Sequence, residues 1–138
     1  IYMGDWSSDV CSSDLFDMMR ILAADDSASM RDMVRMSLGS AGFDVTAAAD
    51  GEEALRLAVA TPFDLILLDV NMPIRNGFDV TRALRAEPQY RHTPILMLTT
   101  ESSADAKREG KIAGATGWII KPFDPVQLVA TVHRVLLR

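Results

Sequence analysis

Three aspartates in the sequence follow apolar runs and could together bind a divalent cation. Asp25 and Asp26 come directly after one such run, and Asp69 comes directly after another. Carboxylates that lie close together repel one another and raise each other's pKa, and a hard cation such as Mg²⁺, which prefers oxygen ligands, relieves that repulsion. The alternative is a structural role, because Asp26 or Ser27 could cap a following helix. Acids at the ends of two separate runs favour the metal site.

Two further polar residues follow later apolar runs and could bind a phosphoryl group. Thr99 offers a hydroxyl donor at the end of one run, and Lys121 follows the last run. A lysine ammonium is a compact, strongly hydrated charge that suits a phosphoryl oxygen, although most lysines are ordinary surface residues. Pro122 directly after the lysine could reflect a cis peptide bond that aims the lysine inward.

An alternation of short apolar runs and helical patterns positions these residues. The apolar runs are residues 21–24, 45–47, 65–68, 95–98 and 118–120. Between and after them lie helical patterns at 30–41, from a capping-box start at 50–53, at 80–84, at 104–113, and from a cap and first-turn proline at 124–125. Such alternation predicts a parallel sheet with helices on both faces and ligands at the carboxyl ends of the strands. The weaker run at 45–47 suits an edge strand.

Length and composition restrict the chain to one folded domain. It has 138 residues, of which 49% are hydrophobic and 24% charged, which is typical of a globular protein and not of a disordered one. No run of about 18 apolar residues occurs, so we expect no insertion into a membrane. The formal charge of −5 argues against non-specific binding of nucleic acid. A single cysteine excludes an internal disulfide framework.

The first 17 residues differ from the rest in composition. They carry four of the 19 acids and no base, so the remainder has 15 acidic against 14 basic residues and is nearly neutral. Residues 5–15 are similar to the translation of a common sequencing-library adapter. We therefore expect residues 1–17 to be a disordered, non-native extension and residues 18–138 to form the domain.

In their order along the chain, the polar residues above resemble those of the response regulator receiver domain, the CheY-like domain of two-component signalling. The resemblance rests on Asp25-Asp26-Ser27, on the segment 69–73, on Thr99 and on the segment 121–123, and it covers residues 20–138. It implies a flavodoxin-like, doubly wound α/β fold. In that fold five parallel strands lie in the order 2-1-3-4-5 and five helices cover them.

The resemblance also implies a role for each acid. Asp69 would accept a phosphoryl group from a histidine kinase or a histidine phosphotransfer protein. Asp26, Asp69 and the main-chain carbonyl of Asn71 would bind Mg²⁺, and Asp25 would act mainly through waters on the metal. Such a domain catalyses only its own phosphorylation and dephosphorylation, so we expect a signalling phosphoacceptor and not an enzyme.

A conformational switch is the second implication of the resemblance. Lys121 would pair with one phosphoryl oxygen, Thr99 would move to donate a hydrogen bond to another, and the aromatic ring of Trp118 would turn as Thr99 moves. The face formed by the helix at 104–113, the strand at 118–120 and the last helix would then bind a downstream protein, as in chemotaxis. We expect a cytoplasmic protein without direct contact to nucleic acid.

Three alternatives remain open at this point. A flavodoxin shares the architecture, but Asp25 and Asp26 would repel the flavin phosphate in the absence of a metal. A phosphatase with an aspartyl nucleophile needs a second acid two residues after Asp69, where Asn71 stands. Within the receiver interpretation, the chain could be a fragment of a larger, multidomain regulator.

Overall fold

The computed structural model of the protein describes residues 19–100, 104–121 and 123–136. The expectations for residues 1–17 and for the peptide bond of Pro122 lie outside these ranges. Within the described ranges, no helix is both long enough and apolar enough to cross a membrane.

A single five-stranded sheet forms the centre of the molecule. Its strands are β1 (Arg20–Ala24), β2 (Asp44–Ala48), β3 (Leu65–Asp69), β4 (Ile95–Thr99) and β5 (Gly117–Ile120). All pairs are parallel, and the order is β2-β1-β3-β4-β5. The expected flavodoxin-like order is therefore confirmed. Every residue of β3 and β4 is buried, whereas β2 is mostly half-exposed at one edge, as the weaker run at 45–47 predicted.

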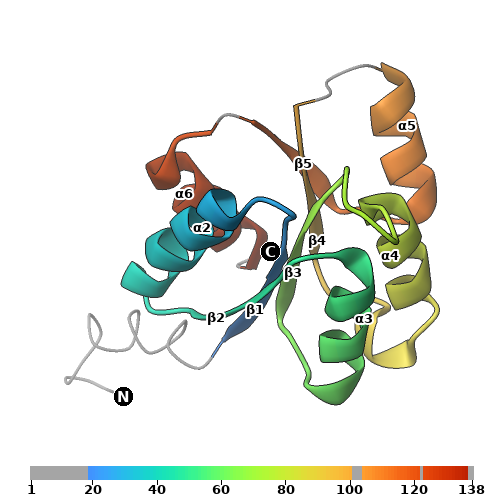
Figure 1. Ribbon diagram of the computed structural model, residues 1–138, viewed down its shortest axis with the longest axis horizontal. Coiled ribbons are helices and arrows are strands. Elements are labelled where there is room, and N and C mark those ends of the chain that lie inside the picture. The colour runs from blue at the N-terminus through green and yellow to red at the C-terminus, as the bar shows by residue number, and fades with distance from the viewer. Residues whose placement is uncertain (1–18, 101–103, 122, 137–138) are drawn as a thin grey trace, which may run out of the picture.

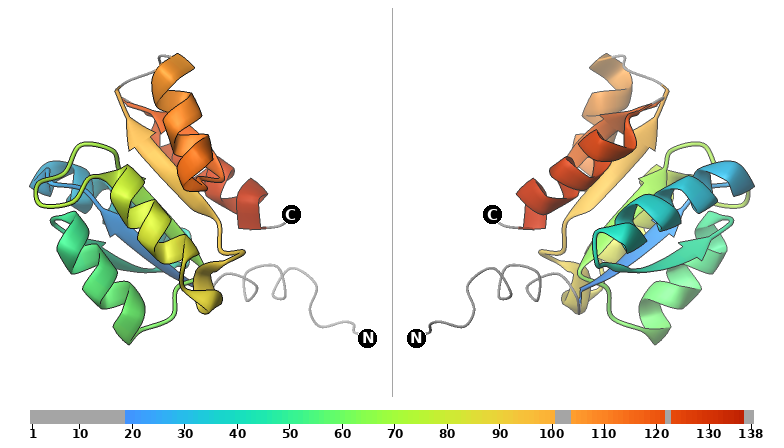
Figure 2. Two further views of the ribbon diagram at one scale, coloured as in Figure 1. Left: turned by 90° about the vertical axis from the view of Figure 1, so that its right-hand side faces the viewer. Right: turned by 90° about the vertical axis from the view of Figure 1, so that its left-hand side faces the viewer.

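Five α-helices cover the two faces of the sheet. They are α2 (Ala28–Ser40), α3 (Gly51–Ala60), α4 (Gly77–Arg85), α5 (Ala104–Ala113) and α6 (Pro125–Leu136). Helices α2 and α6 lie on one face, and α3, α4 and α5 lie on the other (Figures 1 and 2). A short 3₁₀ helix at Pro88–Tyr90, which the sequence pattern did not predict, follows α4.

Side-chain caps define where the helices begin. Ser27 caps α2 by accepting a hydrogen bond from the Met30 N–H, which assigns the capping role to Ser27 and not to Asp26. Asp50 caps α3 in the predicted way, by accepting from the Glu53 N–H at 2.8 Å. Each cap follows the carboxyl end of a strand, so these starts fix the loops at that edge of the sheet.

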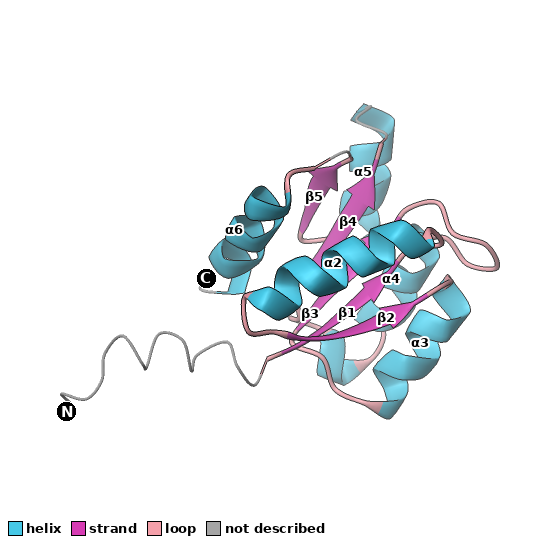
Figure 3. Ribbon diagram, turned by 60° about the vertical axis from the view of Figure 1, so that its left-hand side comes forward, coloured by secondary structure: helices cyan, strands magenta, loops and turns pink. Residues whose placement is uncertain are grey.

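The alternation of side chains along the strands builds two separate hydrophobic cores. Figure 3 shows α2 crossing in front of the strands, with α4 behind them. Leu68 and Met97 point to the core on the α4 side, which also contains Phe78 of α4. Leu67 and Leu98 point to the core on the α2 side. Burial on both faces explains why the central strands are continuous apolar runs.

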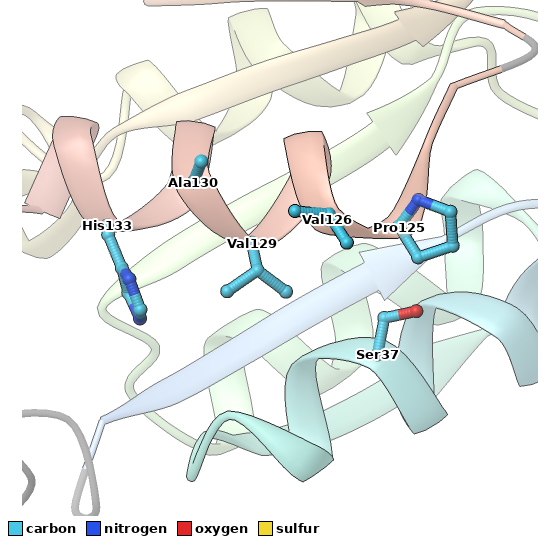
Figure 4. Close-up of a pocket in the computed structure, with 6 residues that line it drawn as sticks. All are labelled: Ser37, Pro125, Val126, Val129, Ala130 and His133. Carbon is cyan, nitrogen blue, oxygen red and sulfur yellow. The ribbon is translucent and has the colours of Figure 1, made fainter.

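An open groove of about 430 Å³ lies between α2 and α6 (Figure 4). Its lining is mostly apolar and consists of Ser37 of α2 and five residues of α6: Pro125, Val126, Val129, Ala130 and His133. The groove contains no carboxylate, so it is separate from the acidic edge described next.

Candidate metal and phosphoryl site

The three aspartates predicted from the sequence meet at the carboxyl edge of the sheet. Strands β1 and β3 are neighbours, with Ala24 opposite Leu68, so the residues that follow lie side by side. One carboxylate oxygen from each of Asp25, Asp26 and Asp69 lies within 4.8 Å of the others. Asp25 and Asp69 are only 3% and 5% exposed, whereas Asp26 is exposed to solvent. The cluster is thus a partly buried concentration of negative charge.

Lys121 brings one positive charge into this cluster. Its Nζ donates to Asp25 Oδ2 at 2.8 Å and lies 3.3 Å from Asp69 Oδ1. The lysine follows β5, two strands away from β3, so the sheet order carries it to the same edge. The surface-lysine alternative is therefore wrong, because this side chain is largely buried between two carboxylates.

Backbone hydrogen bonds hold Asp25 in place. Its own N–H donates to the Ala48 carbonyl at 3.0 Å, and its Oδ1 accepts from the Ser27 N–H at 3.0 Å. The Arg31 guanidinium of α2 donates to the Asp25 carbonyl at 2.8 Å. The sequence analysis missed Arg31, although its place one turn into a helix that starts beside the acids could have suggested a contact with this loop.

The loop after Asp69 is closed tightly on itself. The Gly77 N–H donates to the Val70 carbonyl at 2.9 Å, and the Asn71 N–H donates to Asp69 Oδ1 at 3.4 Å. A Cβ on Gly77 would lie 2.6 Å from the Asp69 carbonyl oxygen, so only glycine fits there. Gly77 is the second positioning residue that the sequence analysis missed, because an Asn-Gly pair indicates only a turn.

The surroundings of the site raise the pKa values of both Asp69 and Lys121. Burial, and then the charge of Asp25, raise the pKa of Asp69 from 3.8 to about 6, against the effect of Lys121. For Lys121, burial disfavours the ammonium, but the hydrogen bond to Asp25 and the two carboxylate charges outweigh it and raise the pKa. The shift at Asp69 thus comes first from burial, whereas the shift at Lys121 reflects the negative charge that surrounds it.

Thr99 lies at the same carboxyl edge of the sheet as this cluster, and Trp118 lies on the neighbouring strand β5. Thr99 ends β4, is 1% exposed, and shares a face with Met97, which lies opposite Trp118 on β5. Trp118 is half-buried and packs against the core on the α4 side. Its ring meets Phe78 edge-on, with centroids 6.3 Å apart. The structure therefore places Thr99 at the acidic edge. Trp118 lies on the neighbouring strand, beside Met97 and further from that edge.

The donors at the edge fit a small, hard divalent cation. They are carboxylate oxygens, and within the described part of the chain one ammonium group offsets only one of three negative charges. A divalent cation would neutralise the remainder and lower the pKa of Asp69. Asn71, which follows Asp69 by two residues, is exposed at the same rim.

Comparison with known proteins identifies the architecture and this acidic edge. Residues 21–133 match the family model of the response regulator receiver domain. The chain belongs to this family. Receiver domains bind Mg²⁺ at an acidic site, and the cluster of Asp25, Asp26 and Asp69 corresponds to such a site. The flavodoxin and phosphatase alternatives are no longer needed.

The individual relatives agree with this assignment. The chain is 37% identical over 121 residues to the chemotaxis protein CheY of Pseudomonas aeruginosa, covering 87% of this chain and 98% of that protein. The solved structure of chemotaxis response regulator CheY4 of Vibrio cholerae is 53% identical and superposes with a TM-score of 0.83. It covers 86% of this chain and 98% of that one.

A second solved structure carries a metal. It is the receiver domain of sensor histidine kinase PA1611 from Pseudomonas aeruginosa, with a magnesium ion coordinated in the active site cleft. It is 30% identical, has a TM-score of 0.81, and covers 87% of this chain and 98% of that one. Other curated relatives are transcriptional or DNA-binding regulators, and the chain spans about half of their length. The expected absence of nucleic-acid contact is therefore untested.

Proposed function

We propose that the protein is the phosphoacceptor of a two-component system and that Asp69 takes the phosphoryl group. The observation that carries the proposal is the pairing of a buried, raised-pKa Asp69 with Lys121 inside a cluster of three carboxylates. All polar contacts of the Asp69 carboxylate with described residues involve Oδ1. Its Oδ2 is therefore the oxygen available to attack.

The donor is the phosphohistidine of a histidine kinase or of a histidine phosphotransfer protein. An Asp69 oxygen forms the new bond to phosphorus while the bond between phosphorus and the imidazole nitrogen breaks, and the electron pair stays on that nitrogen. The product is an acyl phosphate on Asp69. The protein catalyses no other reaction in this proposal, so it is a signalling phosphoacceptor and not an enzyme acting on separate substrates.

Asp26, Asp69 and the main-chain carbonyl of Asn71 would hold Mg²⁺, with Asp25 acting through its waters. When bound, the cation supplies charge neutralisation between the entering phosphoryl group and the carboxylates. The solved PA1611 receiver domain, which contains magnesium in its active site cleft, supports this assignment by similarity. Lys121 lies where its ammonium can pair with a phosphoryl oxygen once Asp69 is modified.

The output of the domain is a change at the face formed by α5, β5 and α6. Thr99 moves to donate its hydroxyl to a phosphoryl oxygen, and Trp118, on the same side of the sheet, adjusts with it. A bound phosphoryl group biases such an equilibrium only as far as one state binds it better. A downstream protein then binds this face. The likeness to chemotaxis proteins supports a free-standing role, and the longer relatives support the alternative of a receiver within a larger regulator.

The test is phosphorylation of the full chain by a small phosphoryl donor such as acetyl phosphate, with Mg²⁺ or with a chelator, followed by intact mass measurement. We expect one added phosphoryl group only when Mg²⁺ is present, and none in Asp69→Asn. Asp105→Asn, which changes an exposed acid on α5, is the matched control and should be modified like the parent. Equal labelling of Asp69→Asn and the parent would overturn the proposal.

A further inference from the structure

Helix α5 packs on the rest of the protein through small residues. The buried residues of α5 are Gly110 and Ala113, whereas its large apolar residue Ile112 is 76% exposed. A helix face made of glycine and alanine cannot fill the space above a sheet by itself. The volume must be filled by a side chain that reaches up from the sheet.

Trp118 of β5 is that side chain. A Cβ on Gly110 would clash with Cζ2 of the indole and would lie 3.0 Å from Cη2 and 3.2 Å from Cε2. The six-membered part of the indole therefore lies directly against the backbone of α5. The ring of Phe78 on α4 also meets the indole edge-on. The indole therefore contacts both α4 and α5.

Glycine at position 110 has no backbone reason to be there. Positive φ angles occur at Gly42 and Gly114, but Gly110 is an ordinary helical residue, where glycine is among the poorest helix formers. Gly39 of α2 is a contrasting case, because a Cβ there would meet nothing within 4 Å. At Gly110 the missing side chain is explained by the indole.

We propose that Gly110 is a positioning residue. Because it has no side chain, the Trp118 indole packs directly against the backbone of α5, and we call this contact the seat of the indole. The seat couples the position of α5 to Thr99. This coupling rests on the proposed function, because it concerns the response to a phosphoryl group at Asp69. Met97 lies opposite Trp118, and Thr99 is two residues further along the same face of β4. Thr99 and Met97 thus belong to the same row of side chains on β4, and the indole packs against this row. A shift of Thr99 therefore changes the surface that the indole contacts.

An added methyl group at position 110 leaves the protein two responses. Either the indole turns out of its seat, or α5 moves away from β5. Both weaken the contact of the half-buried indole with α5 and so expose more of the ring to solvent. The rigid ring cannot yield locally, unlike the end of a flexible side chain.

The first measurement is tryptophan fluorescence of the full chain in a Trp6→Phe background, so that Trp118 is the one emitting tryptophan. We expect Gly110→Ala to shift the emission to longer wavelength and to raise the acrylamide quenching constant at least twofold. Gly39→Ala is the matched control and should leave both unchanged. If Gly110→Ala left both the emission wavelength and the quenching constant unchanged, the proposed packing of the indole on Gly110 would be overturned.

The second measurement is the urea unfolding midpoint followed by circular dichroism, which still reports if Gly110→Ala is poorly folded. Gly110→Ala should lower the midpoint of the parent. In a Trp118→Phe background, where the clashing part of the indole is gone, Gly110→Ala should raise it, because alanine is the better helix former. If Gly110→Ala lowered the urea midpoint equally in both backgrounds, the size of the Trp118 ring would not explain the glycine, and the proposal would be overturned.

The third measurement separates the seat from the proposed function. With acetyl phosphate and Mg²⁺, Gly110→Ala should gain the same phosphoryl mass as the parent but lose most of the Trp118 fluorescence change that accompanies it. An undiminished fluorescence change would overturn the coupling to Thr99. A parent that gains no phosphoryl mass would instead overturn the proposed function, and the quenching and urea results would still decide on the seat.

Discussion

Helices α4 and α5 follow neighbouring strands and pack against each other on the same face of the sheet, yet they are held in different ways (Figure 2). Helix α4 buries large side chains, including Phe78, Val80 and Leu84, and its first residue closes the loop from Asp69. Helix α5 buries only Gly110 and Ala113. The region of α4 is therefore a firm support for the proposed phosphoacceptor Asp69, and α5 is anchored by smaller buried side chains than α4.

Truncating one apolar side chain on each helix tests this difference directly. We expect the largest change in the free energy of unfolding from this pair of variants. Leu84→Ala removes a fully buried side chain of α4 and should lower the free energy of unfolding by about 2–5 kcal/mol. Ile112→Ala removes an exposed side chain of α5 and should change it by less than about 0.5 kcal/mol. Urea unfolding measures both. Similar losses in the two variants would show that α5 is anchored as firmly as α4.

Arg85, at the end of α4, ties the two helices together at one end. Its guanidinium donates to the carbonyls of Gly114, Tyr90 and Thr93 at 2.9, 2.7 and 2.7 Å. A lysine cannot reach these carbonyls at once, so Arg85→Lys should lower the free energy of unfolding by about 2–3 kcal/mol.

The control for this change is Arg82→Lys on the same helix. Arg82 forms an exposed ion pair with Asp79, and its replacement should cost less than about 0.5 kcal/mol. Hydrogen exchange of residues 113–116 should rise in Arg85→Lys and stay unchanged in Arg82→Lys. If both variants left exchange unchanged, the end of α5 would not depend on Arg85.

A smaller effect is expected at Asp69, in the region that α4 supports. Its pKa is raised from 3.8 to about 6, first by burial and then by Asp25, so the native protein binds this proton more tightly than the unfolded chain does. The stability of the metal-free protein should therefore fall as the pH rises from about 4 through about 6. Asp69→Asn should remove this slope and stabilise the protein at pH 7 by about 1–2 kcal/mol.

Urea unfolding between pH 4 and pH 8, with a chelator present, measures the slope. Added Mg²⁺ should stabilise the parent at pH 7, because a ligand that binds only the native state stabilises it more the lower its Kd. The effect on Asp69→Asn should be much smaller, because this variant lacks one of the proposed carboxylate ligands. A parent whose stability rises with pH over this range would contradict the assigned charge balance.

The smallest effect concerns strain in the loop that leads to α4. Ile74 is a β-branched residue with φ of 71°, a conformation that costs such a residue about 1 kcal/mol, and it is 75% exposed. Ile74→Asn should stabilise the protein by about 0.5–1 kcal/mol, because asparagine tolerates this conformation. Val59→Asn on α3 changes another largely exposed β-branched residue, 64% exposed and with helical backbone, and should give no gain. Equal midpoints for the two variants would exclude strain at Ile74.

Much of the fold could be predicted from the sequence, because the apolar runs and helix caps indicate the same elements that the folded structure contains. The five apolar runs became the five strands, Asp50 capped a helix as predicted, and Ala104–Ala113 was predicted with its observed bounds. The strand order came from the family resemblance and was confirmed. Periodicity alone could not have provided it, since the run at 118–120 is as apolar as a central strand but lies at an edge.

The acids and Lys121 could be predicted because they directly follow strands, and parallel strands bring such residues to one edge. Gly77, Arg85 and Gly110 could not, because each acts through a contact with a residue distant along the chain or across a loop. A glycine in a helical pattern indicates a weak helix position, and only the position of Trp118 reveals what the missing side chain makes room for.

Hydrogen exchange of the protein with and without acetyl phosphate, in the presence of Mg²⁺, tests the central claim most directly. Phosphorylation of Asp69 should change exchange in α5 and β5 and leave α4 unchanged, and Asp69→Asn should show no change anywhere. Changes confined to α4, or the same changes in Asp69→Asn, would contradict the central claim.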